Sequence, residues 1–115
     1  MTNKIPLPGT PVRGSASGSP IMALFDLLGR RWAMGVLWQL AENRAPCTFR
    51  ELQSLCEMIS PGVLNARLKE LRSADLIEKT DGGYTVTKLG QEVYNALLPL
   101  SAVSKQWAHA LKENH

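Results

Sequence analysis

One stretch, residues 48–87, constrains the fold more than any other, because two short helices joined by a tight turn run directly into a β-hairpin. Thr48 and Glu51 have the spacing of a capping box, in which a hydroxyl and a carboxylate each satisfy an unpaired amide at a helix start. The short helix that follows has its apolar residues at Phe49, Leu52 and Leu55. This spacing predicts about two helical turns, followed by a tight connection.

A second helix is predicted to begin at Ser60 and to end near Ala74. Ser60 is a favourable N-cap, and Pro61 suits the first helical position because its missing N–H would be unpaired there anyway. The apolar stripe of this helix consists of Leu64, Leu68 and Leu71. The two short helices together predict a helix-turn-helix, with residues 60–74 as the recognition helix.

A hairpin is predicted directly after the second helix. Residues 76–80 and 84–86 have strand character, and Asp81-Gly82-Gly83 between them is a turn signal because glycine accepts positive φ. A helix-turn-helix followed by such a wing, here residues 76–87, most often binds duplex DNA. We therefore predict a mostly α fold with a small β-hairpin, a winged helix-turn-helix with extra N- and C-terminal dimerisation helices.

Composition narrows the class of protein. The 115 residues suffice for one domain with a modest core. No apolar run reaches the roughly 18 residues of a membrane span, and the N-terminus lacks the apolar segment of a secretory signal, so we expect a cytoplasmic protein. The net charge of +3 permits nucleic-acid binding, although the distribution of charge matters more than its sum.

Residues 1–19 are predicted to be a flexible arm, because a segment so rich in Pro, Gly, Ser and Thr cannot bury enough apolar area. The arm carries Lys4 and Arg13, which leaves two interpretations: an ordinary disordered tail, or an arm that touches DNA or wraps a partner subunit. Residues 20–115 are predicted to form the winged-helix domain with its dimerisation helices.

Two helices are predicted before the helix-turn-helix. Ser19-Pro20 opens the first and Gly29 ends it. Its apolar side consists of Ile21, Leu24, Phe25 and Leu28. The second, residues 32–41, is apolar nearly all round. A helix in a small domain is not covered entirely by its own chain, so we expect one face of this helix to meet the core and another a second subunit.

After the wing, Thr87 is predicted to cap a further helix, which Pro99 kinks or breaks because proline removes a backbone donor and clashes with the preceding turn. The last helix then has an apolar stripe that fits either core packing or, as we favour, a dimer seam. The predicted dimer interface comprises Ile21, Leu24, Phe25, Trp32, Leu100, Val103, Trp107 and Leu111.

The recognition helix would present a mainly polar side if its three leucines face the core. The outward residues are then Gly62, Ala66, Lys69 and Ser73, with Asn65 and Arg72 on one edge and Arg67 and Glu70 on the other. Asn65 could pair with an adenine edge, and Arg67 with guanine or a phosphate. Gly62 and Ala66 offer no hydrogen-bonding side chains, so we expect DNA shape and backbone contacts to carry much of the selectivity.

The remaining DNA contacts are predicted from charge. Lys79 is the main positive charge of the wing and could touch the minor groove or a phosphate, although a purely structural hairpin fits nearly as well. Arg50 and Lys88 are further phosphate candidates. The predicted DNA-binding residues are Arg50, Ser60, Pro61, Gly62, Asn65, Ala66, Arg67, Lys69, Arg72, Lys79 and Lys88.

No enzyme chemistry is predicted, because the sequence has no nucleophile elbow, phosphate loop or zinc-peptidase motif. His109 and His115 lack the spacing of metal ligands, so we expect neither a metal nor a cofactor. Cys47 and Cys56 match neither a disulfide framework nor a zinc pattern. They could act as thiol sensors if exposed with a lowered pKa, but buried and unreactive thiols are the better interpretation.

Several motifs, taken in order, resemble those of the HxlR-type winged-helix regulators, a branch close to the MarR group. Leu28-Gly29-Arg30-Arg31-Trp32 and Leu37-Trp38-Gln39-Leu40 resemble the family's Gly-Gly-Lys-Trp and Leu-Trp-x-Leu patterns. Phe49-Arg50-Glu51-Leu52 resembles its Phe-x-Glu-Leu, and Tyr84-Thr85-Val86-Thr87 with Gly90 its Tyr-x-Leu-Thr-x-x-Gly. The resemblance spans about residues 20–111.

The resemblance implies a cytoplasmic, bacterial homodimer that binds a pseudo-palindromic operator in double-stranded DNA and regulates transcription, with the first and last helices building the dimer. Many members have a cysteine just before the proline of the first helix, used in some as an electrophile or redox sensor, whereas Ser19 stands there in this chain. A small-molecule effector in an apolar pocket at the dimer seam is a further option. The alternative function is a winged-helix protein-interaction module without DNA affinity.

Overall fold

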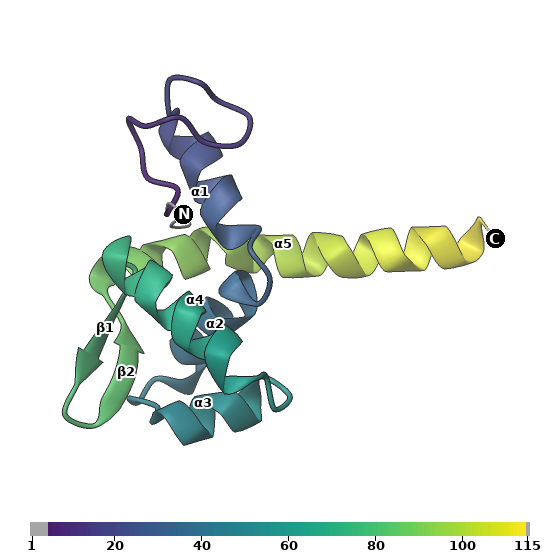
Figure 1. Cartoon of the computed structure of the whole chain (residues 1–115). Coiled ribbons are helices and arrows are strands. Elements are labelled where there is room, and N and C mark those ends of the chain that lie inside the picture. The colour runs from purple at the N-terminus through teal and green to yellow at the C-terminus, as the bar shows by residue number, and fades with distance from the viewer. Residues whose placement is uncertain (1–4, 115) are drawn as a thin grey trace.

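Five helices and one hairpin make up residues 5–114, the part of the chain that the computed structural model describes. Lys4 and His115 lie outside the described residues. The elements are α1 (Pro20–Leu28), α2 (Ala33–Asn43), α3 (Phe49–Leu55), α4 (Pro61–Ser73), β1 (Ile77–Thr80), β2 (Gly83–Val86) and α5 (Lys88–Glu113). The order of helix, helix-turn-helix and hairpin from α2 to β2 confirms the predicted winged helix-turn-helix (Figure 1).

Helix α2 lies at the centre of the fold and contacts α1, α3, α4, α5 and β2. Its Val36, Leu37 and Leu40 are buried in the core, and the ring of Trp38 meets that of Tyr94 on α5 edge to face, with centroids 4.9 Å apart. Most of the surface of this helix is therefore covered within the protomer, and the predicted contact of another face with a second subunit stays a prediction. The chain's own elements cover it, and Met34 is its one large apolar residue among those exposed.

The turn between α1 and α2 differs from the prediction. Trp32 is not the first helical residue but the N-cap of α2, with a left-handed φ of 71°. Its carbonyl accepts the first helical bond, from the amide of Val36 at 2.9 Å. A left-handed aromatic residue is an outlier, because its Cβ crowds its own backbone. The spacing of apolar residues does not indicate a left-handed backbone conformation at Trp32. The start of the helix was therefore predicted one residue too early.

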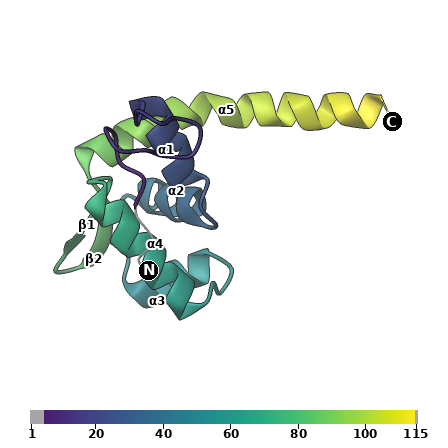
Figure 2. The same ribbon diagram turned by 45° about the horizontal axis from the view of Figure 1, so that its top comes forward.

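Helix α5 runs without interruption through Pro99, so the predicted break is wrong. Proline removes the bond to the carbonyl of residue 95, but Asn95 is exposed and water can satisfy that oxygen. The 26-residue helix packs on the domain with its N-terminal half, and its C-terminal half projects away as a rod (Figures 1 and 2). None of the helices within residues 5–114 combines the length and apolar character needed to cross a membrane.

Residues 5–19 form a loop that folds back beside α1 (Figure 1). The amide of Gly9 donates to the carbonyl of Gly18 at 3.0 Å, and Val12 and Ser15 exchange backbone hydrogen bonds of 2.9 and 3.0 Å. The amide of Arg13 donates to Asp26 Oδ2 at 3.0 Å, which ties the tip of the loop to α1. The arm predicted at residues 1–19 thus has a defined path over its described part.

Candidate nucleic-acid interface

The helix-turn-helix is fixed by two caps that the sequence predicted. Thr48 and Glu51 form the expected capping box, with bonds of 2.9 and 3.1 Å. Ser60 caps α4 by accepting from the amide of Val63 at 3.3 Å. Between the two helices, Glu57 and Met58 both have positive φ, and the side-chain Nε2 of Gln53 donates to the Ile59 carbonyl at 2.9 Å to hold the turn.

Helix α4 buries its leucine stripe and exposes a polar side. Leu64, Leu68 and Leu71 are each at most 1% exposed. The predicted site residues of α4 that are exposed are Pro61, Gly62, Asn65, Lys69 and Arg72, with the N-cap Ser60 beside them. The structure therefore brings an amide, two cations and the small residues of the first turn together on one uncovered surface.

Ala66 and Arg67 are less exposed to solvent than their positions on a helical wheel suggest. Both are half-buried, because the turn between α1 and α2 covers this edge of α4. Arg30 Nη1 of that turn lies 2.8 Å from Glu70 Oε2, and Arg67 Nε lies 3.4 Å from Glu70 Oε1. The exposed side of α4 is thus displaced toward Asn65, Lys69 and Arg72, and Arg67 takes part in an ion-pair group on the other edge.

Glu70 is the residue that sequence reasoning missed. We predicted it at the edge of the outward side, yet it is 9% exposed. Its spacing of three residues from Arg67 was a local signal for an ion pair. The partner Arg30 lies 40 residues away in the sequence, and no local pattern contains that contact.

The wing is a two-stranded hairpin that a third segment extends. Thr80 pairs with Gly83 and Ile77 with Val86, which leaves Asp81 and Gly82 as the loop. Cys47 pairs with Tyr84 through bonds of 2.9 and 2.7 Å, so the residue before the capping box lies beside β2. A Cβ on Gly83, at φ 127°, would clash with the Cys47 carbonyl, so glycine is required there.

The positive residues of the wing and its flanks lie on separate elements. Lys79 is exposed, with its ammonium 5.7 Å from the centroid of the Tyr84 ring. Lys88 follows Thr87, whose hydroxyl donates to the Asp75 carbonyl at 2.7 Å near the C-terminal end of α4. Arg50 is exposed on α3. The predicted cations outside α4 thus come from three elements, α3, β1 and the start of α5.

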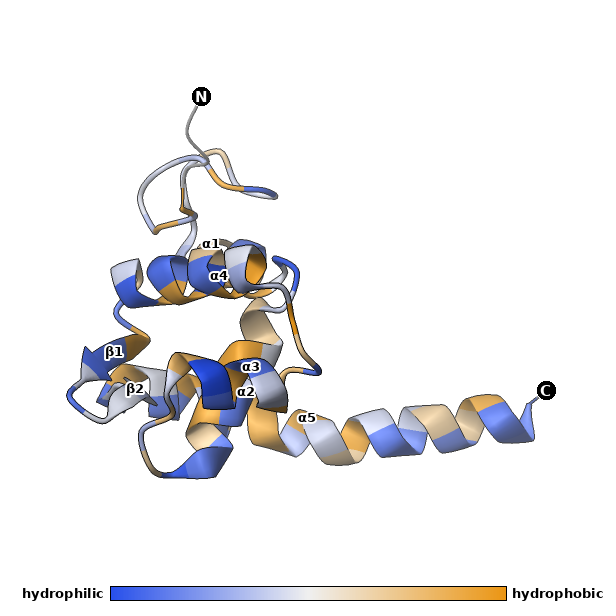
Figure 3. Cartoon of the chain, turned by 60° about the horizontal axis from the view of Figure 1, so that its bottom comes forward, coloured by the Kyte–Doolittle hydropathy of each residue, from blue (hydrophilic) through white to orange (hydrophobic). Residues whose placement is uncertain are grey.

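The predicted dimer residues lie along α1 and α5. Ile21 and Phe25 are 53% and 59% exposed. On α5 the exposed fractions are 57% for Leu100, 52% for Val103, 65% for Trp107 and 43% for Leu111. Leu24 is half-buried in the groove between α1 and α5, and Trp32 is half-buried against the core. Figure 3 shows hydrophobic residues recurring along the projecting part of α5.

Both cysteine side chains are buried, as predicted, with 1% of Cys47 and 3% of Cys56 exposed. Burial raises the pKa of the Cys47 thiol, and the charge of Glu51 adds to the rise. Burial also raises the pKa of Cys56, with smaller contributions from Cys47 and Glu57. A raised pKa lowers the thiolate fraction at neutral pH, and burial also limits access to both sulfur atoms. The described residues contain no cluster of potential metal ligands.

Comparison with known proteins links this winged helix-turn-helix to transcriptional regulators. A family model described as "Domain of unknown function (DUF7347)" matches residues 22–97. YodB from B. subtilis, solved with bound quinone, is 30% identical with a TM-score of 0.68, and the match covers 75% of this chain and 96% of YodB. A possible HxlR family transcriptional factor from Thermoplasma volcanium is 28% identical with a TM-score of 0.67, covering 83% and 86% of the two chains.

A curated relative agrees with these structures. An uncharacterized HTH-type transcriptional regulator of Methanocaldococcus jannaschii is 28% identical over 93 residues, which cover 77% of this chain and 86% of the relative. The match over residues 22–97 includes the helix-turn-helix and the wing whose geometry is described above. The chain therefore belongs to the DUF7347 family, and it is a DNA-binding winged helix-turn-helix transcriptional regulator of the HxlR type.

Proposed function

We propose that the protein acts in the cytoplasm as a homodimer on a pseudo-palindromic operator, with α4 in the major groove and the β1–β2 wing near the backbone or the minor groove. The observation that carries this proposal is the uncovered polar side of α4, where Asn65, Lys69 and Arg72 are exposed opposite a fully buried leucine stripe. Two such helices about 34 Å apart would meet successive major grooves on one side of the duplex.

The exposed residues of α4 divide into one that can contact a base and others that can contact phosphates. Asn65 can pair bidentately with an adenine edge, and Lys69 and Arg72 supply phosphate contacts further along the helix. Gly62 has open space where a Cβ would be, so its backbone can approach a groove wall closely. With one amide as the main base reader, DNA shape and backbone contacts would supply much of the selectivity.

The dimer is supported by an apolar groove of about 460 Å³ between α1 and α5. Phe25 of α1 and Leu97 of α5 line its two walls, and Leu100 joins it to the exposed stripe of α5. Apolar surface of this extent on a soluble protein marks an interaction site. A second copy carries the same groove and the same projecting stripe, so a two-fold arrangement buries both at once.

Binding of the full chain to duplex DNA tests the proposal. Sedimentation should give two protomers per palindromic site, and log affinity should fall linearly with log salt. Replacing Asn65 by alanine should weaken binding selectively across a series of base-substituted operators, whereas Asn114→Ala, at the far end of α5, should change nothing. A uniform loss across the series would remove Asn65 as a base reader. Absence of binding at low salt would favour the protein-interaction module.

The cysteines of this chain can be compared with the thiol chemistry suggested by the structures of YodB. YodB has been solved in quinone-bound and in diamide-treated forms. In this chain Ser19 precedes the proline of α1, and Cys47 and Cys56 are both buried. We propose that DNA binding by this protein does not depend on thiol oxidation.

A further inference from the structure

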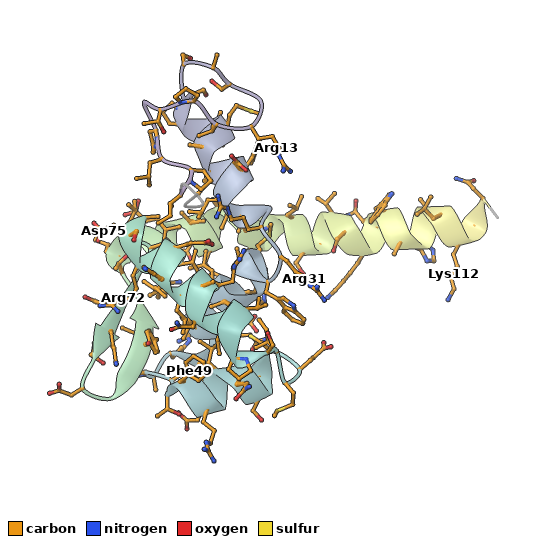
Figure 4. The ribbon with its side chains drawn as sticks, viewed as in Figure 1. Arg13, Arg31, Phe49, Arg72, Asp75 and Lys112 are labelled. Carbon is orange, nitrogen blue, oxygen red and sulfur yellow. The ribbon has the colours of Figure 1, made fainter. Side chains whose placement is uncertain are left out.

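A polar pocket of about 330 Å³ lies beside the apolar groove assigned to the second subunit and shares Gly29 with it. It is lined by Arg13, Asp26, Gly29, Arg30, Arg31 and Arg67. These residues come from the N-terminal loop, α1, the turn between α1 and α2, and α4. Figure 4 shows Arg31 and Arg72 on either side of α4, so the pocket belongs to the edge of α4 away from the exposed reading side.

The outer part of the pocket is held by the N-terminal loop. The amide of Arg13 donates to Asp26 Oδ2 at 3.0 Å, and the reciprocal bonds between Val12 and Ser15 close the turn that presents Arg13. This fixes the backbone of Arg13 through its amide and leaves the guanidinium at the surface. Arg31 is exposed on the opposite wall.

The inner part is built on a buried carboxylate. Glu70 accepts a 2.8 Å hydrogen bond from Arg30 and lies 3.4 Å from Arg67 Nε. Arg67 Nε and Glu70 Oε1 are both buried and pair with each other as ions, although neither makes a hydrogen bond within the described chain. The carboxylate of Glu70 thus neutralises part of the positive charge of Arg30 and Arg67 at the inner end of the pocket.

The turn that carries Arg30 and Arg31 is itself strained. Trp32 follows them with φ 71°, and the amide of Ala33 donates to the Arg30 carbonyl at 3.0 Å to close the turn. A bulky residue in this conformation costs free energy, and such strain concentrates at functional sites. The strained residue fixes the direction in which the two arginines leave the backbone.

We propose that this pocket binds a phosphate group. Four guanidinium groups face two carboxylates, those of Asp26 and Glu70, so an excess of positive charge remains. Guanidinium groups stay charged at all physiological pH values and match the oxygens of phosphate with paired N–H donors. Arg13 and Arg31 form the mouth of the site, and Arg67 lines its inner wall.

Two sources can supply the phosphate, and their chemistry is the same. One is a free phosphate-bearing metabolite, which would make the pocket an effector site. The other is the backbone of DNA outside the groove that α4 enters, and this source rests on the proposed function. The experiment separates them by using protein without DNA in one arm and protein with DNA in the other.

In the first arm, inorganic phosphate is titrated into the full-length protein while the arginine Nε–Hε resonances are followed by NMR. Chloride at equal ionic strength is the reference. Saturable shifts of the Arg31 and Arg67 resonances are expected with phosphate alone. Arg13→Gln and Arg31→Gln should each weaken the binding about tenfold, the loss of one charge-assisted contact, whereas Arg44→Gln, an exposed arginine at the end of α2, should not.

In the second arm, the salt dependence of binding to duplex DNA is compared among the same variants. If the backbone supplies the phosphate, Arg31→Gln lowers the slope of log affinity against log salt by about 0.9, and Arg44→Gln does not. If both variants keep the wild-type slope while free phosphate binds, the source is a metabolite. Wild-type slopes together with no saturable phosphate shift would overturn the site. If the chain binds no DNA at all, the first arm alone decides.

Discussion

Two helices of this protein have apolar stripes with the same helical spacing, and only one stripe is covered. On α4, Leu64, Leu68 and Leu71 are at most 1% exposed. On the C-terminal half of α5, the stripe from Leu100 to Leu111 is between 43% and 65% exposed. The spacing shows that each helix needs a partner, but it does not say whether that partner is the chain itself or another molecule.

The uncovered surfaces of the two helices also differ in chemistry. The exposed side of α4 offers an amide and two cations, which suit base edges and phosphates. The exposed side of α5 is apolar and continuous with the groove beside α1, which suits a second copy of the same surface. The contrast predicts that substitutions on α4 leucines unfold the protomer, whereas substitutions on the α5 stripe separate subunits.

The largest effect is expected from Leu68→Ala. The Leu68 side chain is buried on the core side of α4, so its truncation leaves a cavity. The free energy of unfolding should fall by about 2–5 kcal/mol. Urea denaturation followed by circular dichroism measures this change. Leu111→Ala, on the exposed end of α5, is the matched control and should cost far less at protein concentrations where the chain is monomeric. Equal losses of unfolding free energy in the two variants would contradict the proposed difference between the covered stripe of α4 and the exposed stripe of α5.

The next largest effect is expected from Trp107→Ala, which should weaken the dimer by about 2–4 kcal/mol because a central aromatic anchor is lost. Sedimentation equilibrium measures the dimer constant, and circular dichroism checks that the protomer stays folded. Lys112→Ala changes an exposed residue near the end of the same helix and should leave the constant unchanged (Figure 4). A wild-type chain that sediments as a monomer at all concentrations would contradict the proposed seam.

A smaller effect is expected on the polar side of α4. Lys69→Gln should reduce the slope of log affinity against log salt by about 0.9, because one phosphate contact is lost. Fluorescence anisotropy with a labelled duplex across a salt series gives the slope. Lys105→Gln removes the same charge from α5 and should leave the slope as in the wild type. If both substitutions act alike, the response reports overall charge and not the position of α4.

The smallest effect concerns the thiols. The folded-state pKa values of Cys47 and Cys56 are raised by burial, so unfolding releases protons where thiols ionise. The stabilisation is complete below the ordinary thiol pKa of about 8.5 and is lost as the pH rises through the folded-state values. Urea unfolding between neutral and alkaline pH should show this decline, and a Cys47→Ser, Cys56→Ser double variant should show a flatter profile. At neutral pH, diamide should leave DNA binding unchanged.

Most local structure could be predicted from residues close together in the sequence. The capping box at Thr48 and Glu51, the cap at Ser60 and the cap at Thr87 all form as predicted, because each joins atoms within one helical turn. The turn at residues 81–83 is also local, although the requirement for Gly83 comes from the carbonyl of Cys47. The failed predictions were of two kinds. The start of α2 at Trp32 and the break at Pro99 failed locally, whereas the outward position of Glu70 failed because Arg30 reaches it from 40 residues away.

The sequence by itself determined the helix boundaries set by caps, the turn chemistry of the wing and the spacing of every apolar stripe, because these depend on local hydrogen bonds and helical periodicity. Only the tertiary structure decided that α2 is covered by its own chain, that Glu70 joins Arg30 across 40 residues and that α5 continues through Pro99. These outcomes depend on which surfaces pack together after folding. An apolar stripe with a given spacing can pack against several different surfaces.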